Sequence, residues 1–455
     1  MPVAFCFNEV RRNGLRCGDR PCVKGSSRKR DSANLVCSHA RYFGIQLYLS
    51  QWMLSAVRAV RAAAIERVGM AQGLSTGSGI ALNLIRSGQA TTRNDLIDVL
   101  GWSRITLARR LDELLAESII VSVGQLDSRG GRPPETFAVN PVAGLLLAVD
   151  IGGSHTRLAI TDLVSTMLSV DEADIGLSEG PAEIFEWAGQ VFDHMLQRLG
   201  KTRQDVVGIG VGVPGPVDVA TGRLASPQID PQWDGILVRE YFSGRYDHAV
   251  FAVDRDVNTL ALAEARRGWS HYKNLVVVKA GIGLGLAYVL DGSVYRGARG
   301  GAGDLSKPHI DGGRLQRLES VASGAVIRQE LTARGYKVRT SADIVRFARE
   351  GDAATLALLE ETGSTIGQTM ADVVGLLNPE AVIVGGNLAE AGDPFLRPIR
   401  EAIFRGARDF ASRDLIVERS RLAHAAGVTG ASLIAQDALF NADRISKITR
   451  VGVSS

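Results

Sequence analysis

Three glycine-rich turns and their neighbouring aspartates are the residues of this sequence best suited to chemistry on a phosphorylated ligand. Each turn follows an apolar run of the kind that forms a strand, so its backbone N–H groups and one serine hydroxyl become available to a phosphate and its Mg²⁺. The candidate nucleotide phosphate-binding residues are Asp150, Gly152, Gly153, Ser154, Gly281, Gly283, Gly385 and Gly386. One such turn alone is typical of an ordinary hairpin, whereas three in this order indicate a ligand site.

A second set of informative residues lies between 103 and 110, on a predicted helix. With Leu107 and Leu111 facing a core, the opposite side carries side chains that suit a DNA major groove. Arginine either reads guanine bidentately or holds a phosphate. The DNA-binding candidates on this segment are Ser103, Arg104, Thr106, Arg109 and Arg110. A solvated helix face in a bundle is the alternative interpretation.

The tripeptide Gly131-Arg132-Pro133 adds a third signal. It places one arginine between a residue without a side chain and one with a fixed φ, which favours a slim, extended backbone that can enter a narrow A·T-rich minor groove. Arg129 would assist on a phosphate. The alternative is a proline-stiffened turn whose arginine is simply solvated.

The elements that would position these arginines are three short helices and a ribbon. Thr92 followed by Asp95 predicts a capping box at the start of the second helix, Gly101 would end it, and Ser103 would cap the third. Alternating strands at 119–123 and 136–139 flank a turn-rich loop. Residues 76–140 are therefore predicted to form a winged helix-turn-helix domain.

The elements that would position the glycine turns belong to an α/β architecture. Three segments near 145–151, 156–162 and 165–171 predict an antiparallel meander. Further strands are predicted at 206–213, 249–253, 274–279, 284–290 and 381–385, separated by helical segments. The glycine hairpins near 152 and 281 look alike, which suggests two duplicated lobes within residues 143–440.

Composition and charge bound the class of protein. The 455 residues are 45% hydrophobic and 22% charged, which excludes a wholly disordered or collagen-like chain. The net charge of +3 is unevenly distributed, and the excess of positive charge lies near the N-terminus. Residues 1–70 hold 12 Lys and Arg against 4 Asp and Glu. We expect residues 1–70 to be a disordered basic arm or a mis-called start, with a nucleic-acid tail as the alternative, and 441–455 to be a tail.

Cysteine usage and hydropathy indicate a reducing compartment. All four cysteines lie between Cys6 and Cys37, in a spacing that matches no zinc pattern, so no metal ligand is assigned among them. Neither a signal peptide nor a membrane span is predicted, because charged and polar residues interrupt each apolar stretch. A cytoplasmic location and no contact with a membrane are the resulting expectations.

Residues 76 to about 437, nearly four fifths of the chain, resemble the ROK family. Besides the helix-turn-helix and its Gly-Arg-Pro wing, the motifs that carry the resemblance are Asp150-Ile-Gly-Gly-Ser154, Gly212-Val-Pro-Gly-Pro216, Asp256 followed by Asn258, Gly297 to Gly303 followed by Asp304, and Pro379-Glu-Ala-Val-Ile-Val-Gly-Gly386. The resemblance implies a two-lobed actin-like ATPase (ribonuclease H-like) fold preceded by a winged helix-turn-helix. Members of the family are either sugar kinases or transcriptional repressors.

Departures from the family pattern bear on which of the two applies. The family's sugar-binding Asn-Asp pair, whose Asp is the general base of the kinases, is here Arg255 and Asp256. The Gly-Thr before the second phosphate turn is Lys279 and Ala280. The resemblance implies the effector or sugar contacts Gly215, Arg255, Asp256, Asp304, His309 and Glu319. His309 matches the family pattern only if the alignment is shifted by a few residues at that point.

The family's zinc loop is also altered. The segment before Glu319 is shorter than the family's and holds no cysteine, so zinc is predicted to be absent, and the usual sugar pocket is put in doubt. No cofactor is expected, and MgATP enters only if the chain is a kinase. Arg255 predicts either an anionic ligand or an internal salt bridge with Asp254 or Asp304.

Three hypotheses follow. The preferred one is a transcriptional regulator of carbohydrate metabolism, more a repressor than an activator, that binds double-stranded operator DNA as a homodimer or tetramer under the control of a sugar or sugar phosphate. The alternative is a sugar kinase with Asp256 as general base, for which vestigial activity is the most that we expect. A structural scaffold would explain the fold but not the arginines.

Overall fold

The computed structural model describes residues 77–125, 135–218, 221–225, 231–304, 308–311 and 314–441. The predicted basic extension, the wing tip with Arg129 and Arg132, the side chain of His309 and the predicted tail beyond residue 441 lie outside the described residues. Among the described residues, no helix is both long and apolar enough to cross a bilayer.

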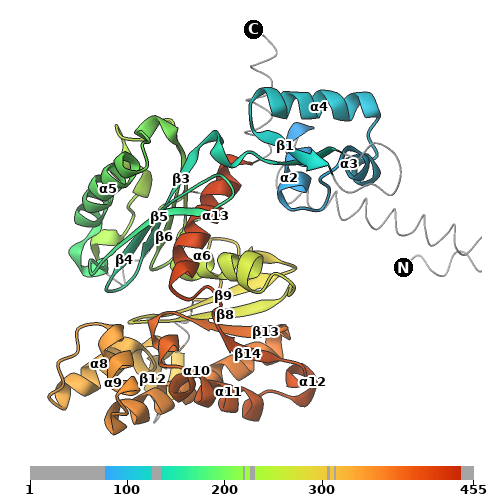
Figure 1. Cartoon of the computed structure of the whole chain (residues 1–455). Coiled ribbons are helices and arrows are strands. Elements are labelled where there is room, and N and C mark those ends of the chain that lie inside the picture. Colours follow the sequence, from blue (N-terminus) through green and yellow to red (C-terminus); the bar gives the residue numbers. More distant parts are fainter. Residues whose placement is uncertain are drawn as a thin grey trace, which may run out of the picture. The chain divides into compact units, whose positions relative to one another are not determined.

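The first described elements are three helices and an antiparallel ribbon, here called the three-helix segment (Figure 1). The helices are α2 (Ser78–Arg86), α3 (Arg93–Leu100) and α4 (Arg104–Ala116), and the strands are β1 (Ile120–Gln125) and β2 (Glu135–Val139). The capping box of Thr92 and Asp95, the left-handed Gly101 and the cap of Ser103 on the Thr106 N–H are all present. The winged helix-turn-helix itself stays a prediction, because its tip is not among these residues.

The first lobe is built on a five-stranded sheet of order β5-β4-β3-β6-β7. Its strands are β3 (Leu145–Ile151), β4 (Thr156–Thr161), β5 (Met167–Ala173), β6 (Val206–Val213) and β7 (Val250–Arg255). The predicted meander β3–β4–β5 is antiparallel, whereas β6 and β7 are parallel to β3. Helix α5 (Pro181–Arg198) buries its apolar stripe in the core of this lobe.

The second lobe repeats this topology, with strand order β10-β9-β8-β13-β14. Its strands are β8 (Leu275–Ala280), β9 (Leu284–Leu290), β10 (Ser293–Tyr295), β13 (Ala381–Gly385) and β14 (Ile416–Arg419). Three strands are again antiparallel and two are added in parallel. The duplicated lobes expected from the two glycine hairpins are therefore present, while the short β10 and β14 had no signal in the sequence.

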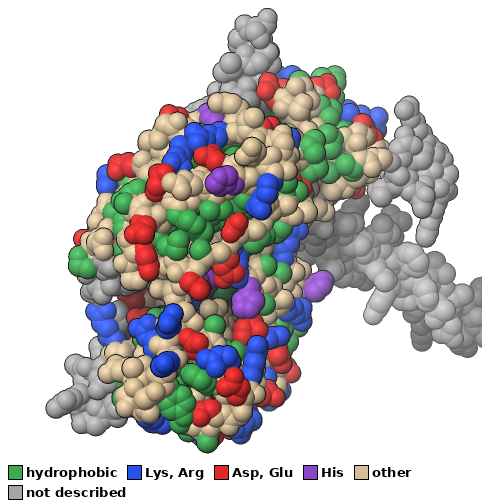
Figure 2. Space-filling view, turned by 60° about the vertical axis from the view of Figure 1, so that its left-hand side comes forward, with side chains coloured by type: hydrophobic (Ala, Val, Ile, Leu, Met, Phe, Trp, Pro, Cys, Tyr) green, Lys and Arg blue, Asp and Glu red, His purple; other side chains and the backbone are tan. Residues whose placement is uncertain are grey.

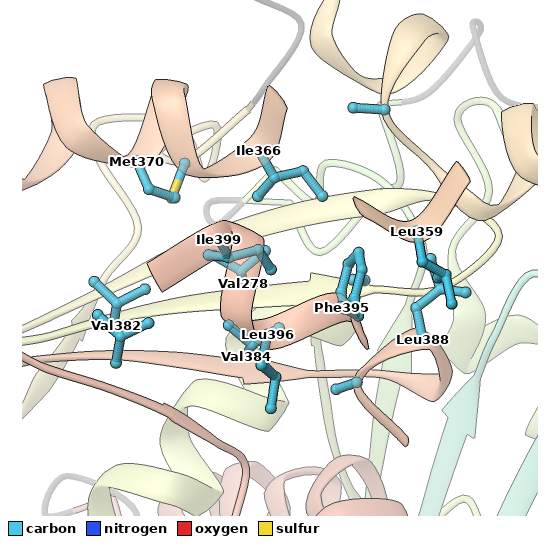
Figure 3. Close-up of a cluster of buried hydrophobic side chains, with 14 of the residues drawn as sticks. Val278, Leu359, Ile366, Met370, Val382, Val384, Leu388, Phe395, Leu396 and Ile399 are labelled. Carbon is cyan, nitrogen blue, oxygen red and sulfur yellow. The ribbon is translucent and has the colours of Figure 1, made fainter. Parts of the chain in front are cut away.

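Helices cover the second sheet and supply the largest core. They are α7 (Leu318–Val321), α8 (Gly324–Ala333), α9 (Ser341–Arg349), α10 (Ala353–Leu377), α11 (Asp393–Gly406) and α12 (Asp409–Ser412). Figure 3 shows side chains of α10 and α11, among them Ile366, Met370 and Phe395, packed against Val382 and Val384 of β13. This packing fixes the strand end that carries the third glycine turn.

Helices α6 (Asp256–Ala263) and α13 (Ala426–Leu439) pack against both sheets (Figure 1). Their approach depends on glycine. A Cβ at Gly430 would lie 1.8 Å from the carbonyl oxygen of Thr259, and one at Gly210 would lie 1.9 Å from that of Ala431. Because glycine has no side chain, α13 can lie closer to α6 and β6 than any larger residue at these two positions would allow.

A hairpin that was not predicted occupies the segment that corresponds to the family's zinc loop. Strands β11 (Pro308–Asp311) and β12 (Arg314–Arg317) pair antiparallel through their backbones, with His309 opposite Gln316. Helix α7, which bears Glu319, follows directly. Backbone pairing thus orders the segment that stands in place of the family's zinc loop and for which no zinc is predicted.

Candidate functional site

One cavity brings together nearly all the residues proposed for the ligand. It has a volume of about 930 Å³ and is lined by the glycine turns of both lobes and by the start of α6. The predicted residues that line it are Asp150, Gly152, Gly153, Ser154, Gly215, Arg255, Asp256, Gly281, Gly283, Asp304, Glu319, Gly385 and Gly386. Figure 2 shows charged side chains of both signs along the hollow between the lobes. The remaining candidate, His309, has its side chain outside the described part of the chain.

Lys279 joins two carboxylates inside the cavity. Its Nζ lies 2.9 Å from Oδ2 of Asp256 and 3.4 Å from Oδ1 of Asp150. Burial alone would lower the pKa of Lys279, but the charges of Asp150 and Asp256 outweigh it and raise that pKa above its usual value. The lysine is therefore a fixed cation where Asp150 of the first lobe and Asp256 of α6 meet the second sheet.

Asp256 is occupied on both oxygens. Its Oδ1 accepts a hydrogen bond of 2.7 Å from the Val257 N–H, and its Oδ2 forms an ion pair of 2.9 Å with Lys279. A general base needs an oxygen within hydrogen-bond reach of the proton that it removes. The ammonium of Lys279 therefore competes with a sugar hydroxyl for the Asp256 carboxylate and reduces its strength as a base.

Asp150 faces the first turn of α13. A Cβ at Gly427 would lie 1.9 Å from Oδ2 of Asp150, so the carboxylate rests where that side chain would be. A carboxylate at this end of a helix is favoured by the positive end of the helix dipole. One end of α13 is therefore in direct contact with the cavity.

Arg255 does not form the predicted salt bridge with Asp254. The Asp254 carboxylate instead accepts hydrogen bonds of 2.7 Å each from Arg296 Nε and Asn258 Nδ2. The side chain of Arg255 donates one hydrogen bond, from Nη1 to the Ala302 carbonyl oxygen at 2.6 Å. It is buried, with 6% of its surface exposed, and its Nε has no partner among the described residues.

Glu319 closes the cavity beside the second glycine turn. Its Oε1 accepts a 3.1 Å hydrogen bond from the Leu284 N–H and lies where a Cβ at Gly283 would project. Desolvation raises the pKa of Glu319, the Leu284 bond opposes that shift, and the nearby charges of Asp256 and Asp304 add to it. A glutamate of this kind can accept hydrogen bonds from ligand hydroxyls when it is ionised.

Two groups occur in the family, MgATP and a structural zinc. The glycine turns fit a phosphate, but the ammonium of Lys279 already neutralises Asp150, the carboxylate that would hold Mg²⁺. The residues therefore do not fit MgATP as a kinase would bind it. For zinc, the segment 308–317 offers no cysteine, and no cluster of three metal-binding side chains occurs in the described part of the chain.

Two side chains that sequence reasoning missed also line the cavity. Ser323, just before α8, and Ser341, the first residue of α9, are buried, and their hydroxyls lack a hydrogen-bond partner within the described ranges. No motif in the sequence singles out either serine. Their position became evident only when the second lobe brought α8 and α9 to the cavity.

The predicted DNA-binding residues of helix α4 differ in their exposure to solvent. Arg104 and Arg109 are exposed, Ser103 caps the helix, and Ile105 between them is 84% exposed. Arg110 departs from the expectation, because its guanidinium is half-buried and pairs with Glu113, 3.1 Å away and one turn later. Arg110 therefore lies on the side of the helix toward α2, where Ser78 also bonds Glu113.

The three-helix segment is joined to the far end of α13 by an ionic cluster. Asp437 pairs with Arg86 of α2 and accepts two hydrogen bonds, of 2.9 and 2.7 Å, from Arg266 after α6. Arg86 also donates to Gln436 at 3.2 Å. Desolvation alone would raise the pKa of Asp437, but the two arginines outweigh it and lower that pKa.

Comparison with known proteins agrees with this architecture. The profile of the ROK family matches residues 146–438. The xylose repressor of Caldicellulosiruptor bescii is 26% identical over 375 residues, which cover 77% of this chain and 93% of the repressor.

Two solved structures share the fold. A ROK family transcriptional regulator described as a homologue of the Escherichia coli MLC protein is 24% identical, has a TM-score of 0.68, and matches 82% of this chain and 98% of its own. A ROK family glucokinase from Streptomyces griseus, in complex with glucose and AMPPNP, is 24% identical with a TM-score of 0.52, over 65% of this chain and 100% of its own. With both lobes of the actin-like ATPase fold and their glycine turns in place, this chain belongs to the ROK family.

Proposed function

We propose that this protein is a sequence-specific DNA-binding transcriptional regulator whose ROK domain senses a sugar or sugar derivative. The observation that carries the proposal is the exposed arginine face of α4, in a three-helix segment tied by Asp437 to the helix that reaches the ligand cavity. The relative named as a xylose repressor, which this chain matches over most of its length, supports the same function.

On the DNA side, α4 acts as the recognition helix. Arg104 and Arg109 reach base edges or phosphates in the major groove, and Ser103 and Thr106 hold the start of the helix. Arg132, in the loop between β1 and β2, enters the flanking minor groove. A homodimer would place two such helices in successive major grooves of a pseudo-palindromic operator in the cytoplasm.

On the sensor side, α13 carries the response. Its 14 residues span about 20 Å, with Gly427 against Asp150 at the cavity and Asp437 against Arg86 at the three-helix segment. A ligand that binds one arrangement of the lobes better than another changes the population of the arrangement that fits the operator. The ratio of the two affinities sets how completely repression can be relieved.

The kinase alternative is less supported. Retention of Asp150 and Asp256 is the observation in its favour, but Lys279 engages both carboxylates and Arg255 stands where the family has a small amide. The likeness to the glucokinase concerns the fold, which sensors and kinases of this family share.

The test is to select bound fragments from fragmented chromosomal DNA with the purified full-length protein and to measure affinity for the recovered site by fluorescence anisotropy. Wild-type protein should retain a palindromic site, and Arg132→Ala should weaken binding and relax the A·T preference beside it. The same preparations are assayed for sugar-dependent ATP consumption. Absence of a selected site together with rapid phosphorylation of a sugar would replace the regulator by the kinase.

A further inference from the structure

We propose that the cavity recognises its effector through an anionic group, a phosphate or a carboxylate, that pairs with the buried guanidinium of Arg255. The inference rests on the proposed function, since it names the class of effector for the same sensor domain.

The first observation is a buried charge that forms no ion pair within the described residues. Arg255 is 6% exposed and lines the cavity, and its side chain bonds only the Ala302 carbonyl oxygen among the described residues. Arginine is the side chain best suited to buried ion pairs with carboxylates and phosphates. A buried charge of this kind is costly unless it is paired, and a ligand anion would supply the missing partner.

The second observation is that neighbouring cations are already paired. Lys279 contacts Asp150 and Asp256, Arg296 contacts Asp254, and Arg157 contacts Glu172. Arg255 forms no ion pair with a carboxylate in the described part of the chain. Arg328, which also lines the cavity, forms no ion pair within the described residues either, but it is only half-buried, so the buried charge available to an incoming anion is located at Arg255.

The third observation concerns geometry. Nη1 of Arg255 is engaged by Ala302, whereas Nε and Nη2 form no hydrogen bond with the residues that the structure describes. Since Nε is buried, an anion in the cavity would meet Nη2, which can donate a charge-assisted hydrogen bond to a carboxylate or phosphate oxygen. Asp256 and Glu319, which line the same cavity, can accept hydrogen bonds from the hydroxyls of the attached sugar.

The experiment is calorimetric titration of the full-length protein with D-xylose, D-glucose and N-acetyl-D-glucosamine, each beside its phosphate ester and its sugar acid, and with inorganic phosphate alone. The variants are Arg255→Asn, which restores the family's residue, and Arg255→Lys, which keeps the positive charge but loses the planar guanidinium and its N–H donors. Arg346→Asn is the matched control, because it removes the same charge from an exposed position of α9 outside the cavity.

We expect at least one anionic sugar to bind wild-type protein more tightly than its neutral parent, and the phosphate and acid arms to show which anion is preferred. Arg255→Asn should weaken that binding about 10- to 100-fold and Arg255→Lys less, whereas Arg346→Asn should leave it unchanged. If circular dichroism shows that Arg255→Asn is unfolded, the comparison of Arg255→Lys with Arg346→Asn shows whether Arg255 contributes to binding of the anionic sugar.

The proposal is overturned if neutral sugars bind as tightly as anionic ones, if the Arg255 variants bind the anion as wild type does, or if no anionic sugar binds at millimolar concentration. Anisotropy with the selected DNA site is measured on the same samples. Retained DNA binding in those cases would leave the regulator function standing, whereas its loss in wild-type protein would remove the regulator function itself.

Discussion

The ammonium nitrogen of Lys279 lies 2.9 Å from Oδ2 of Asp256, so the carboxylate that aligns with the family's catalytic base is bound to a cation of the chain itself. The same ammonium lies 3.4 Å from Asp150. One side chain of β8 therefore connects the second sheet to β3 of the first lobe and to α6. This contact bears on both the stability of the cavity and the chemistry that it can perform.

Replacing Lys279 by Ala should lower the free energy of unfolding by about 3 kcal/mol, because two poorly solvated carboxylates would lose their counter-charge. Mg²⁺ should raise the melting temperature of the variant more than that of wild type, since a divalent cation would then take the vacated position. Denaturant unfolding and thermal melts with and without MgCl₂ measure both effects. Lys337→Ala, at an exposed site, is the control. Equal stability and no response to Mg²⁺ would contradict the role given to Lys279.

Replacing Gly427 by Ala should destabilise the protein by about 2 kcal/mol, because the new Cβ would lie 1.9 Å from the Asp150 carboxylate. Gly375→Ala on α10 is the matched control, since nothing lies within 4 Å of its Cβ position. That change should be neutral or stabilise by about 0.5–1 kcal/mol, as alanine does in a helix interior. Urea unfolding of both variants measures the difference. Similar effects at the two positions would argue against close packing at Asp150.

Replacing Asp437 by Asn should reduce the dependence of stability on acid pH. The pKa of Asp437 is lowered in the folded protein, so its ionic contribution is complete above about pH 4, the ordinary value for Asp, and is lost as the pH falls through the lower folded pKa. Wild-type protein should therefore lose more stability than Asp437→Asn between about pH 5 and pH 3. Unfolding curves at several pH values give the two slopes, and parallel slopes would show that the pairs with Arg86 and Arg266 contribute little.

Arg109 and Arg110 are adjacent in the chain, yet their alanine variants should differ. Arg109→Ala should weaken binding to the selected DNA site by about 1–3 kcal/mol with little effect on stability, because Arg109 is exposed. Arg110→Ala should lower stability by about 1 kcal/mol through loss of its contact with Glu113. Anisotropy and thermal melts separate the two effects. Loss of DNA affinity only in Arg110→Ala would exchange the roles of the two residues.

Much of the local structure could be predicted because it depends on neighbours in the chain. The capping box of Thr92 and Asp95 and the left-handed Gly101 are contacts over three or four residues. Strand periodicity likewise predicted β3, β4 and β6 within a residue or so of their observed ends. The short β10 and β14 carry too few residues to show a period, and they form because a longer strand offers them an edge.

The residue types also determined which groups are available: glycine turns for a phosphate, arginines for DNA or an anion, and no cysteine beyond Cys37. Which charges are paired was decided by the tertiary structure alone. Lys279 and Asp150 are 129 positions apart in the chain, and so no local pattern shows that they meet. Asp254 is adjacent to Arg255 in the sequence, but its carboxylate pairs with Arg296. Pairing between charges depends on how two sheets and α13 pack, and that packing is a property of the whole chain.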